Sequence, residues 1–178
     1  MLELVKKVEL PQLDLERIKN EAFKILEKHD LPQIGLTHSI NATEENKLTE
    51  STGSILDRQT RTIKFKETDF TEFNDAYKGS YLHEVYQMLP NIGRFRIMAM
   101  SGPMCYTFHR DFTRRYHIAV ETNINCLFLF PQLSQQFHLP ADSNMYLVDT
   151  RQQHTFVNGS RSRRVHLVLD DLSTIKRS

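Results

Sequence analysis

The chain has 178 residues, of which 39% are hydrophobic and 25% charged, so its length and composition are those of a folded globular protein and exclude wholesale disorder. Its 23 Lys and Arg against 22 Asp and Glu leave a formal net charge of +1, which provides no global field for nucleic acid or an anionic membrane. The N-terminal segment lacks the apolar core of a signal peptide, and no apolar window is long enough to span a bilayer. We therefore expect a single cytoplasmic domain over 1–178.

Two helices are predicted in the first half of the chain. Residues 14–29 place apolar side chains along one helical stripe, and Asp14 can cap the start of that helix. Residues 75–89 repeat the pattern with Tyr77, Leu82, Val85, Tyr86 and Leu89 as the expected buried face, and Pro90 stops it.

The segments between these helices are more polar. Residues 41–54 contain few candidates for a core and predict a mobile surface loop that can border a site. Residues 61–66 alternate between polar and apolar side chains as a strand does. Residues 1–92 are thus expected to form a helical N-terminal part with a loop.

From residue 93 onward the sequence changes to short runs of β-branched, aromatic and methionine residues, several of them separated by turn-forming residues. The predicted strands are 94–100, 104–111, 116–122, 126–131, 145–150, 154–159 and 163–170. Seven strands at this spacing predict a mainly β fold, an antiparallel sandwich or barrel with the helices outside it, and a core over 93–171.

The chain has two cysteines, Cys105 and Cys126, too few for a disulfide framework or a four-thiolate zinc site. Both lie in apolar runs, so we expect two buried thiols.

Alternate side chains of a strand share a face, and three predicted strands divide into one apolar row and one mixed row. The mixed rows hold His109 and Asp111, Arg115 and His117, and Arg164 and His166. Such a row can simply be solvent-exposed surface. The same division in three strands favours a second interpretation, in which the mixed rows line a pocket inside a small barrel.

A metal site is predicted from the mixed rows. His109 and Asp111 stand at i and i+2, and His154 begins a later strand. Two imidazoles and one carboxylate form a facial triad that leaves three positions of a six-coordinate Fe(II) open. Arg164 follows His154 by ten residues, and its guanidinium can hold a carboxylate such as the distal group of 2-oxoglutarate.

The segments HRDFTRRYH and HTFVNGSRSRRVHLVLD resemble the aspartyl/asparaginyl β-hydroxylase-like branch of the Fe(II)/2-oxoglutarate dioxygenases. That branch has a His-x-Asp pair, Arg-x-His on the next strand, and a later His-x9-Arg with an acidic residue closing the strand. The matching positions, all between 93 and 171, are His109, Asp111, Arg115, His117, His154, Arg164 and Asp170. Two departures are a short link from Asp111 to Arg115 and the lack of a serine match in MSGPMCYTF.

The resemblance implies a double-stranded β-helix, which is a cupin-like jelly roll, and the site that goes with it. Iron would be bound by His109, Asp111 and His154. The cosubstrate 2-oxoglutarate would be bound by Arg164, with Arg115 assisting and His117 beside it. With dioxygen, such an enzyme hydroxylates an amino acid, either free, such as proline, or as an Asp, Asn or Pro residue of a peptide.

Substrate contacts are expected from two further residues, His166 on the face of Arg164, and Arg110. Arg94, Arg96 and Arg114 are weighed between substrate contacts and solvated surface. A metal-binding cupin-like isomerase or binding module is the alternative function, since the same ligands hold zinc or nickel. No nucleic acid or membrane partner is expected, and the sequence leaves the oligomeric state open.

Overall fold

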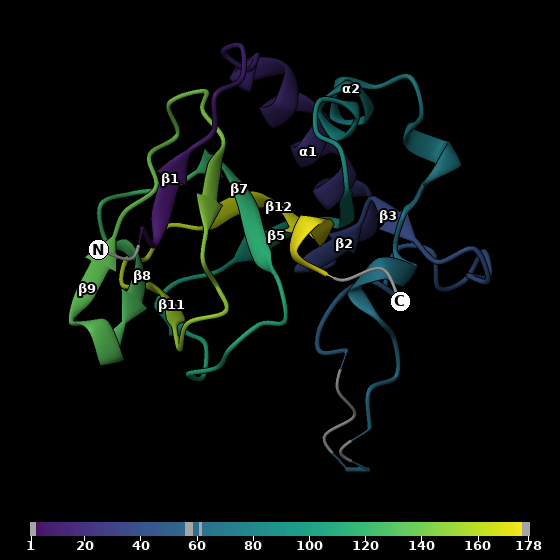
Figure 1. Cartoon of the computed structure of the whole chain (residues 1–178). Coiled ribbons are helices and arrows are strands. Elements are labelled where there is room, and N and C mark those ends of the chain that lie inside the picture. Colours follow the sequence, from purple (N-terminus) through teal and green to yellow (C-terminus); the bar gives the residue numbers. More distant parts are fainter. Residues whose placement is uncertain (1–2, 56–58, 61, 176–178) are drawn as a thin grey trace.

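The computed structural model describes residues 3–55, 59–60 and 62–175, and it consists of antiparallel sheets with helices against one side (Figure 1). The largest sheet has six strands in the order β1-β10-β7-β12-β5-β2. Their bounds are β1 Val5–Lys7, β10 Tyr146–Val148, β7 Arg114–Glu121, β12 Arg164–Asp171, β5 Ile92–Met100 and β2 Gln33–Gly35. β1 and β2 come from the N-terminal part, so residues 1–92 add strands to this sheet as well as helices.

A second sheet has four strands in the order β6-β11-β8-β9. Its bounds are β6 Met104–Cys105, β11 Thr155–Asn158, β8 Cys126–Phe130 and β9 Gln135–Phe137, and a small separate pair joins β3 Thr37–His38 to β4 Glu72–Phe73. From β5 to β12 the chain passes back and forth between the two larger sheets, apart from the β8–β9 hairpin. This topology is a jelly roll, which confirms the expected fold class.

Helix α1, Leu15–His29, forms where the sequence predicted it. The Asp14 side chain accepts a hydrogen bond of 3.0 Å from the Arg17 amide, and Ile18, Ala22, Ile25 and Leu26 are buried. Short 3-10 turns join other elements: η1 Glu67–Asp69, η2 Asp75–Tyr77, η3 Pro131–Leu133 and η4 Leu172–Thr174.

Helix α2 spans Tyr81–Gln87 and is shorter than the predicted 75–89. Gly79 has a φ of +78°, which breaks the helical path, and the Ser80 side chain then caps the new start. The N-terminal part of the predicted helix is therefore the separate turn η2.

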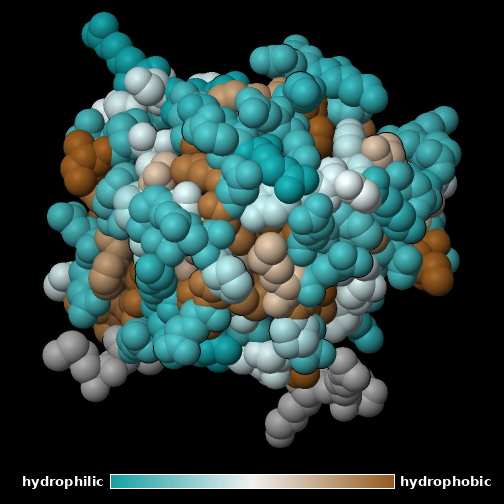
Figure 2. Space-filling model, turned by 90° about the horizontal axis from the view of Figure 1, so that it is seen from above, coloured by the Kyte–Doolittle hydropathy of each residue, from teal (hydrophilic) through white to brown (hydrophobic). Residues whose placement is uncertain are grey.

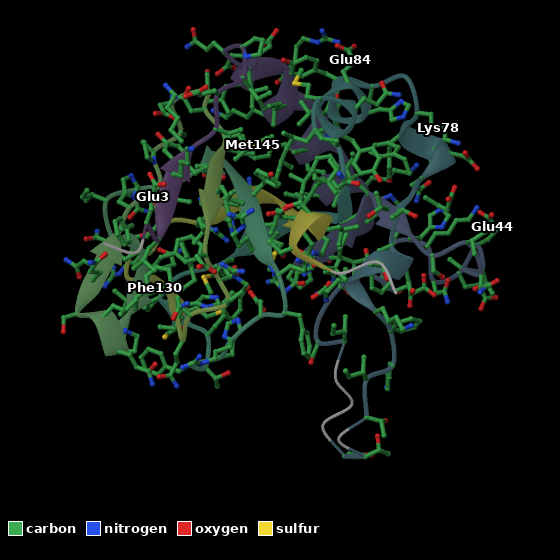
Figure 3. All side chains as sticks on the ribbon, viewed as in Figure 1. Glu3, Glu44, Lys78, Glu84, Phe130 and Met145 are labelled. Carbon is green, nitrogen blue, oxygen red and sulfur yellow. The ribbon has the colours of Figure 1, made fainter. Side chains whose placement is uncertain are left out.

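The main core lies between the helices and one face of the six-stranded sheet. Ile18 and Leu82 of the helices share a buried cluster with the alternate sheet residues Ile118, Val165 and Leu167. Figure 3 shows Phe130 and Met145 directed inward, whereas the labelled acidic side chains lie at the periphery. The face seen in Figure 2, above α1 and α2, is mostly hydrophilic with hydrophobic groups in small patches.

Two strand predictions differ from the structure. In the described part of 61–66 the chain makes only an isolated bridge at Ile63, whose side chain is exposed, so the alternation there buries no face. The run 104–111 is a strand only at Met104 and Cys105, and β9 was not predicted. Arg61 lies outside the described residues.

Cys105 is exposed, contrary to the prediction, because β6 is an edge strand of the smaller sheet. Cys126 is buried as expected. Among the described residues, no helix combines the length and apolar character needed to cross a bilayer.

Candidate active site

A cavity of about 480 Å³ opens among the strands and loops that carry the predicted site residues, and its size is typical of a small-molecule site. Its polar wall includes His109, Asp111, His154, Arg115, His117, Arg164 and Arg110. The mixed rows of β7 and β12 therefore line a pocket. The polar loop also reaches the site, since Gly53 and Ser54 belong to the wall.

The backbone aligns the three candidate metal ligands at one end of the cavity. His109 and His154 face each other across an antiparallel bridge and exchange backbone hydrogen bonds of 3.0 and 2.9 Å. The Asp111 amide donates to the Thr150 carbonyl at 2.9 Å, so Asp111 is also bound to the segment that leads to His154. Residues 109 and 111 therefore reach the site from the loop between β6 and β7, which runs beside the start of β11.

The side chains of this triad converge. Each histidine Nε2 lies 3.7 Å from an oxygen of Asp111, His109 from Oδ1 and His154 from Oδ2. One ligand atom from each residue lies within 4.8 Å of the others. The structure therefore brings together the three residues that the sequence predicted as ligands.

Hydrogen bonds fix the histidine tautomers. Nδ1 of His109 lies 2.7 Å from the Thr107 carbonyl, and Nδ1 of His154 lies 2.9 Å from the Gln152 carbonyl. A nitrogen facing a carbonyl must donate, so each Nε2 directs a lone pair toward Asp111. Burial lowers the pKa of His154, which keeps its ring neutral.

The donor set fits a divalent metal. Oδ2 of Asp111 is buried and finds no hydrogen-bond partner among the described residues, and Nε2 of His154 lies 3.7 Å from it. Two neutral imidazoles and a carboxylate suit iron, and they also suit zinc or nickel. The backbone carbonyls behind the rings are the outer partners that orient such ligands.

Arg115 positions Asp111 from within the protein. Its Nη2 lies 2.9 Å from Oδ1 of Asp111, and its Nε lies 3.2 Å from Oδ1 of Asp170. The resemblance implied that Arg115 assists cosubstrate binding. In the structure this guanidinium also lines the cavity, but its ion-pair partners are the carboxyl groups of Asp111, Asp170 and, at 3.9 Å, Glu67.

A buried ionic network extends behind the triad, and the sequence did not reveal it. Arg94 donates to both carboxylate oxygens of Glu67 at 3.2 Å, and Arg96 pairs with Asp170 at 3.1 Å. Arg94 and Arg96 are fully buried, so the surface alternative is wrong for both. Glu67 comes from η1 in the N-terminal part, and no periodicity in the sequence points to it.

The network shifts the titration of its acids in opposite directions. Burial, followed by a hydrogen bond with Asp170, raises the pKa of Glu67 to about 8. Burial acts against ionisation of Asp170 as well, but the guanidinium groups of Arg115 and Arg96 lower its pKa to about 2. Burial and the charge of Arg94 lower the pKa of Arg96 to about 9.

Arg164 is the cavity residue with the least satisfied charge. Its side chain is 2% exposed, it makes no ion pair within the described part of the chain, and its Nε and Nη2 have no hydrogen-bond partner there. Its guanidinium carbon lies 3.9 Å from the centre of the Phe156 ring. Burial lowers its pKa to about 9. An arginine held in this way is prepared for an anionic ligand.

The remaining predicted residues lie at different places in and around the cavity. His117 lines the cavity near Arg164, and His166 lies behind it, with the two ring centres 5.8 Å apart. Arg110 is exposed at the rim, where it donates to Gln132 at 2.9 Å. Arg114 pairs with Asp171 at 2.7 Å and is not part of the cavity wall.

Two phenylalanines mark the outer edge of the site. Phe108 is 54% exposed and Phe112 is 59% exposed, on either side of the triad segment 109–111. Phe112 lines the main cavity, and Phe108 lines a smaller hollow with Pro131. Neither ring was predicted to belong to the site, although both stand within or beside the motif.

Known proteins share the fold at low sequence identity. No protein-family model and no curated protein matches the sequence. The truncated viral collagen prolyl hydroxylase from Paramecium bursaria Chlorella virus-1 is similar in structure, with a TM-score of 0.51 and 12% identity over 94% of this chain and 89% of that chain. The 2OG complex of that hydroxylase has a TM-score of 0.48 and 10% identity over 94% and 95%. The first of these likenesses shows the shared jelly-roll fold.

Proposed function

We propose that this protein is an Fe(II)- and 2-oxoglutarate-dependent dioxygenase that hydroxylates an amino acid, free or within a peptide. One observation supports the proposal most directly. A two-histidine, one-carboxylate triad and a buried guanidinium without a carboxylate partner, among the described residues, face the same cavity. A metal and an acidic cosubstrate together would satisfy both.

Each cavity residue has a part in the proposal. His109, Asp111 and His154 would hold iron, and Arg164 would hold the distal carboxylate of 2-oxoglutarate. Iron with 2-oxoglutarate and dioxygen supplies the oxidation, while the chain supplies position and electrostatics. Arg115 keeps Asp111 oriented through its 2.9 Å contact. The neutral rings of His117 and His154 present nitrogen atoms without adding positive charge.

The motif and the fold bear on the class of substrate. The spacing of His109, Asp111, His154 and Arg164 resembles the aspartyl/asparaginyl branch, and a structure similar in fold is named a collagen prolyl hydroxylase. Both comparisons favour an Asp, Asn or Pro residue as the substrate.

We propose a residue within a peptide over a free amino acid. Phe108 and Phe112 lie exposed beside the triad. A free amino acid bound in the cavity would leave the outer faces of both rings in water. A peptide crossing the rim would cover them, and exposed apolar rings next to a polar site are typical of partner contacts. Arg110 lies between them on the same loop.

The cofactors are tested without turnover. Under anaerobic conditions, Fe(II) and 2-oxoglutarate should together produce a weak visible charge-transfer band, whereas a zinc-binding isomerase or binding module would stay colourless. Arg164→Ala should lose the band, and Arg161→Ala, which changes an exposed arginine of the same segment, should keep it. A protein that binds zinc tightly and gives no band with iron would contradict the oxygenase assignment.

The substrate is tested by succinate release over the free amino acids and a panel of Asp-, Asn- and Pro-containing peptides. We expect stimulation by peptides, and a higher KM for the best peptide in Phe112→Ala. Stimulation by free proline alone would decide for the small substrate.

A further inference from the structure

The inner end of the cavity holds a cluster of polar groups without partners. Both ring nitrogens of His117 and both of His166 are buried and make no hydrogen bond to any described residue, and the same is true of Nε and Nη2 of Arg164. Arg164 and His166 stand two residues apart on β12, and His117 lies on the adjacent strand β7. These three polar side chains are therefore neighbours at the inner end of the cavity, and none of them makes an ion pair with a described residue.

Both imidazoles are neutral in the fold. Burial, together with the positive charge of Arg164, lowers the pKa of His117 and of His166 well below the ordinary value. A neutral imidazole has one donor and one acceptor nitrogen, so each ring needs two partners of opposite kind. The surrounding walls do not supply them, since the rings pack against Phe128 and Phe156.

His166 is a costly residue for purely structural packing. It is 1% exposed, and Val168, the next residue on the same face of β12, shows that this face accepts a buried aliphatic side chain. Leaving a buried polar atom unpaired costs about 1–3 kcal/mol, and buried polar groups are commonly satisfied by a ligand or an ordered water. The cluster therefore points to bound groups that bring both acceptors and donors.

We propose that His166 is a further positioning residue for the cosubstrate, which rests on the proposed function. His117 donates one ring N–H to the carboxylate that Arg164 holds. An ordered water donates to the other nitrogen of His117 and accepts from His166. His166 therefore acts through the water to fix the orientation of His117, and the site recognises the distal carboxylate of a 2-oxo dicarboxylic acid.

The test compares two cosubstrates that differ only in the relevant group. Binding of 2-oxoglutarate and of 2-oxobutyrate, which lacks the distal carboxylate, is measured by calorimetry on the Fe(II)-loaded full chain without oxygen. His166→Leu should leave the His117 ring without its fixed orientation and weaken 2-oxoglutarate binding about ten-fold, as expected when the hydrogen bond of His117 to a charged group is lost. Binding of 2-oxobutyrate should be unchanged. His166→Gln, which keeps a donor and an acceptor, should recover most of the loss.

The matched control is His38→Leu, because His38 is also buried with an unpartnered Nε2 but is not part of the cavity wall. It should change neither affinity. Two outcomes would overturn this inference and leave the proposed function standing, provided that the wild type binds 2-oxoglutarate. In the first, His166→Leu weakens the binding of both acids equally; in the second, it weakens neither. A metal-loaded wild type that binds neither acid would overturn the proposed function and the inference with it.

Discussion

The two faces of the six-stranded sheet arise from the same strands but are completed in different ways. On β12, Val165, Leu167 and Leu169 pack into the core beneath the helices. The alternate residues Arg164 and His166 lie toward the cavity, where their nitrogen atoms have no partners in the described structure. The apolar face is therefore complete within the chain, and the polar face is prepared for groups that bind from outside.

This difference shows where stability and function are separated. Burial of the apolar row stabilises the fold, whereas a buried arginine and two buried histidines with nitrogens that no described residue pairs oppose folding. Proteins keep such groups where a site needs them. Changes on one face should therefore affect stability, and changes on the other should affect ligand binding, which the following predictions test.

The largest effect is expected from the metal ligands. His154→Ala should remove bound Fe(II) and lower succinate formation by more than about 100-fold. Mutating a residue that only orients a metal ligand already lowers metal affinity or activity about 10–100-fold. Metal content per chain and succinate release measure both. His138→Ala, which changes a partly buried histidine whose Nδ1 contacts the Cys126 carbonyl, is the control and should retain metal.

Arg164 should show opposite effects on binding and stability. Arg164→Leu should weaken 2-oxoglutarate binding by about 2 kcal/mol or more, roughly 30-fold. It should also raise the melting temperature of the metal-free protein, because it removes a buried charge without a carboxylate partner in the described structure. A variant that loses stability together with binding would mean that the guanidinium supports the fold itself.

The apolar face should show the reverse behaviour. Leu167→Ala should reduce the free energy of unfolding by about 2–5 kcal/mol and leave the affinity for 2-oxoglutarate unchanged in the folded fraction. Val168→Ala is the matched change on the other face. Because Val168 lines the cavity, its truncation enlarges an existing space, and urea denaturation should show a smaller loss.

The smallest effect, measured per pH unit, concerns the network behind the triad. Burial raises the pKa of Glu67 from 4.5 to about 8, so between these values the folded chain holds a proton that the unfolded chain has released. The stability that this residue contributes is complete below pH 4.5 and is lost as the pH rises toward 8. Glu67→Gln cannot ionise, so its unfolding free energy relative to wild type should increase across this window by at most about 1.4 kcal/mol per pH unit.

Urea denaturation at several pH values measures this relative slope. Glu72→Gln, which changes an exposed carboxylate on β4, is the control and should follow the wild-type curve. A Glu67→Gln curve parallel to wild type would show that Glu67 is ionised in the fold.

The sequence predicted the features that depend on local periodicity or on spacing. The stripe and cap of α1 were evident, and the alternating rows of β7 and β12 gave the two faces of the sheet correctly. The histidine and aspartate spacing predicted ligands that the structure brings together. The break at Gly79 and the short β6 were missed, because a local pattern does not show a left-handed turn or the lack of a neighbouring strand.

The network residues required the fold. Arg94 and Arg96 look like ordinary surface arginines in the sequence, yet both are buried against Glu67 and Asp170. Glu67 is separated from Asp170 by about a hundred positions, and only the packing of η1 against β5 brings it near. Charge pairing over such a distance leaves no trace in a single sequence.

By itself, the sequence determined which residues alternate and therefore which side chains share a face, because the period of a strand is a local property of the backbone. Only the tertiary structure decided that one of these faces closes over a cavity and that Arg115 turns toward Asp111. It also decided that Arg164 and His166 are buried on that face with ring and guanidinium nitrogens that no described residue pairs. Those outcomes depend on which strands pair and which groups are left after pairing, and these are properties of the whole fold.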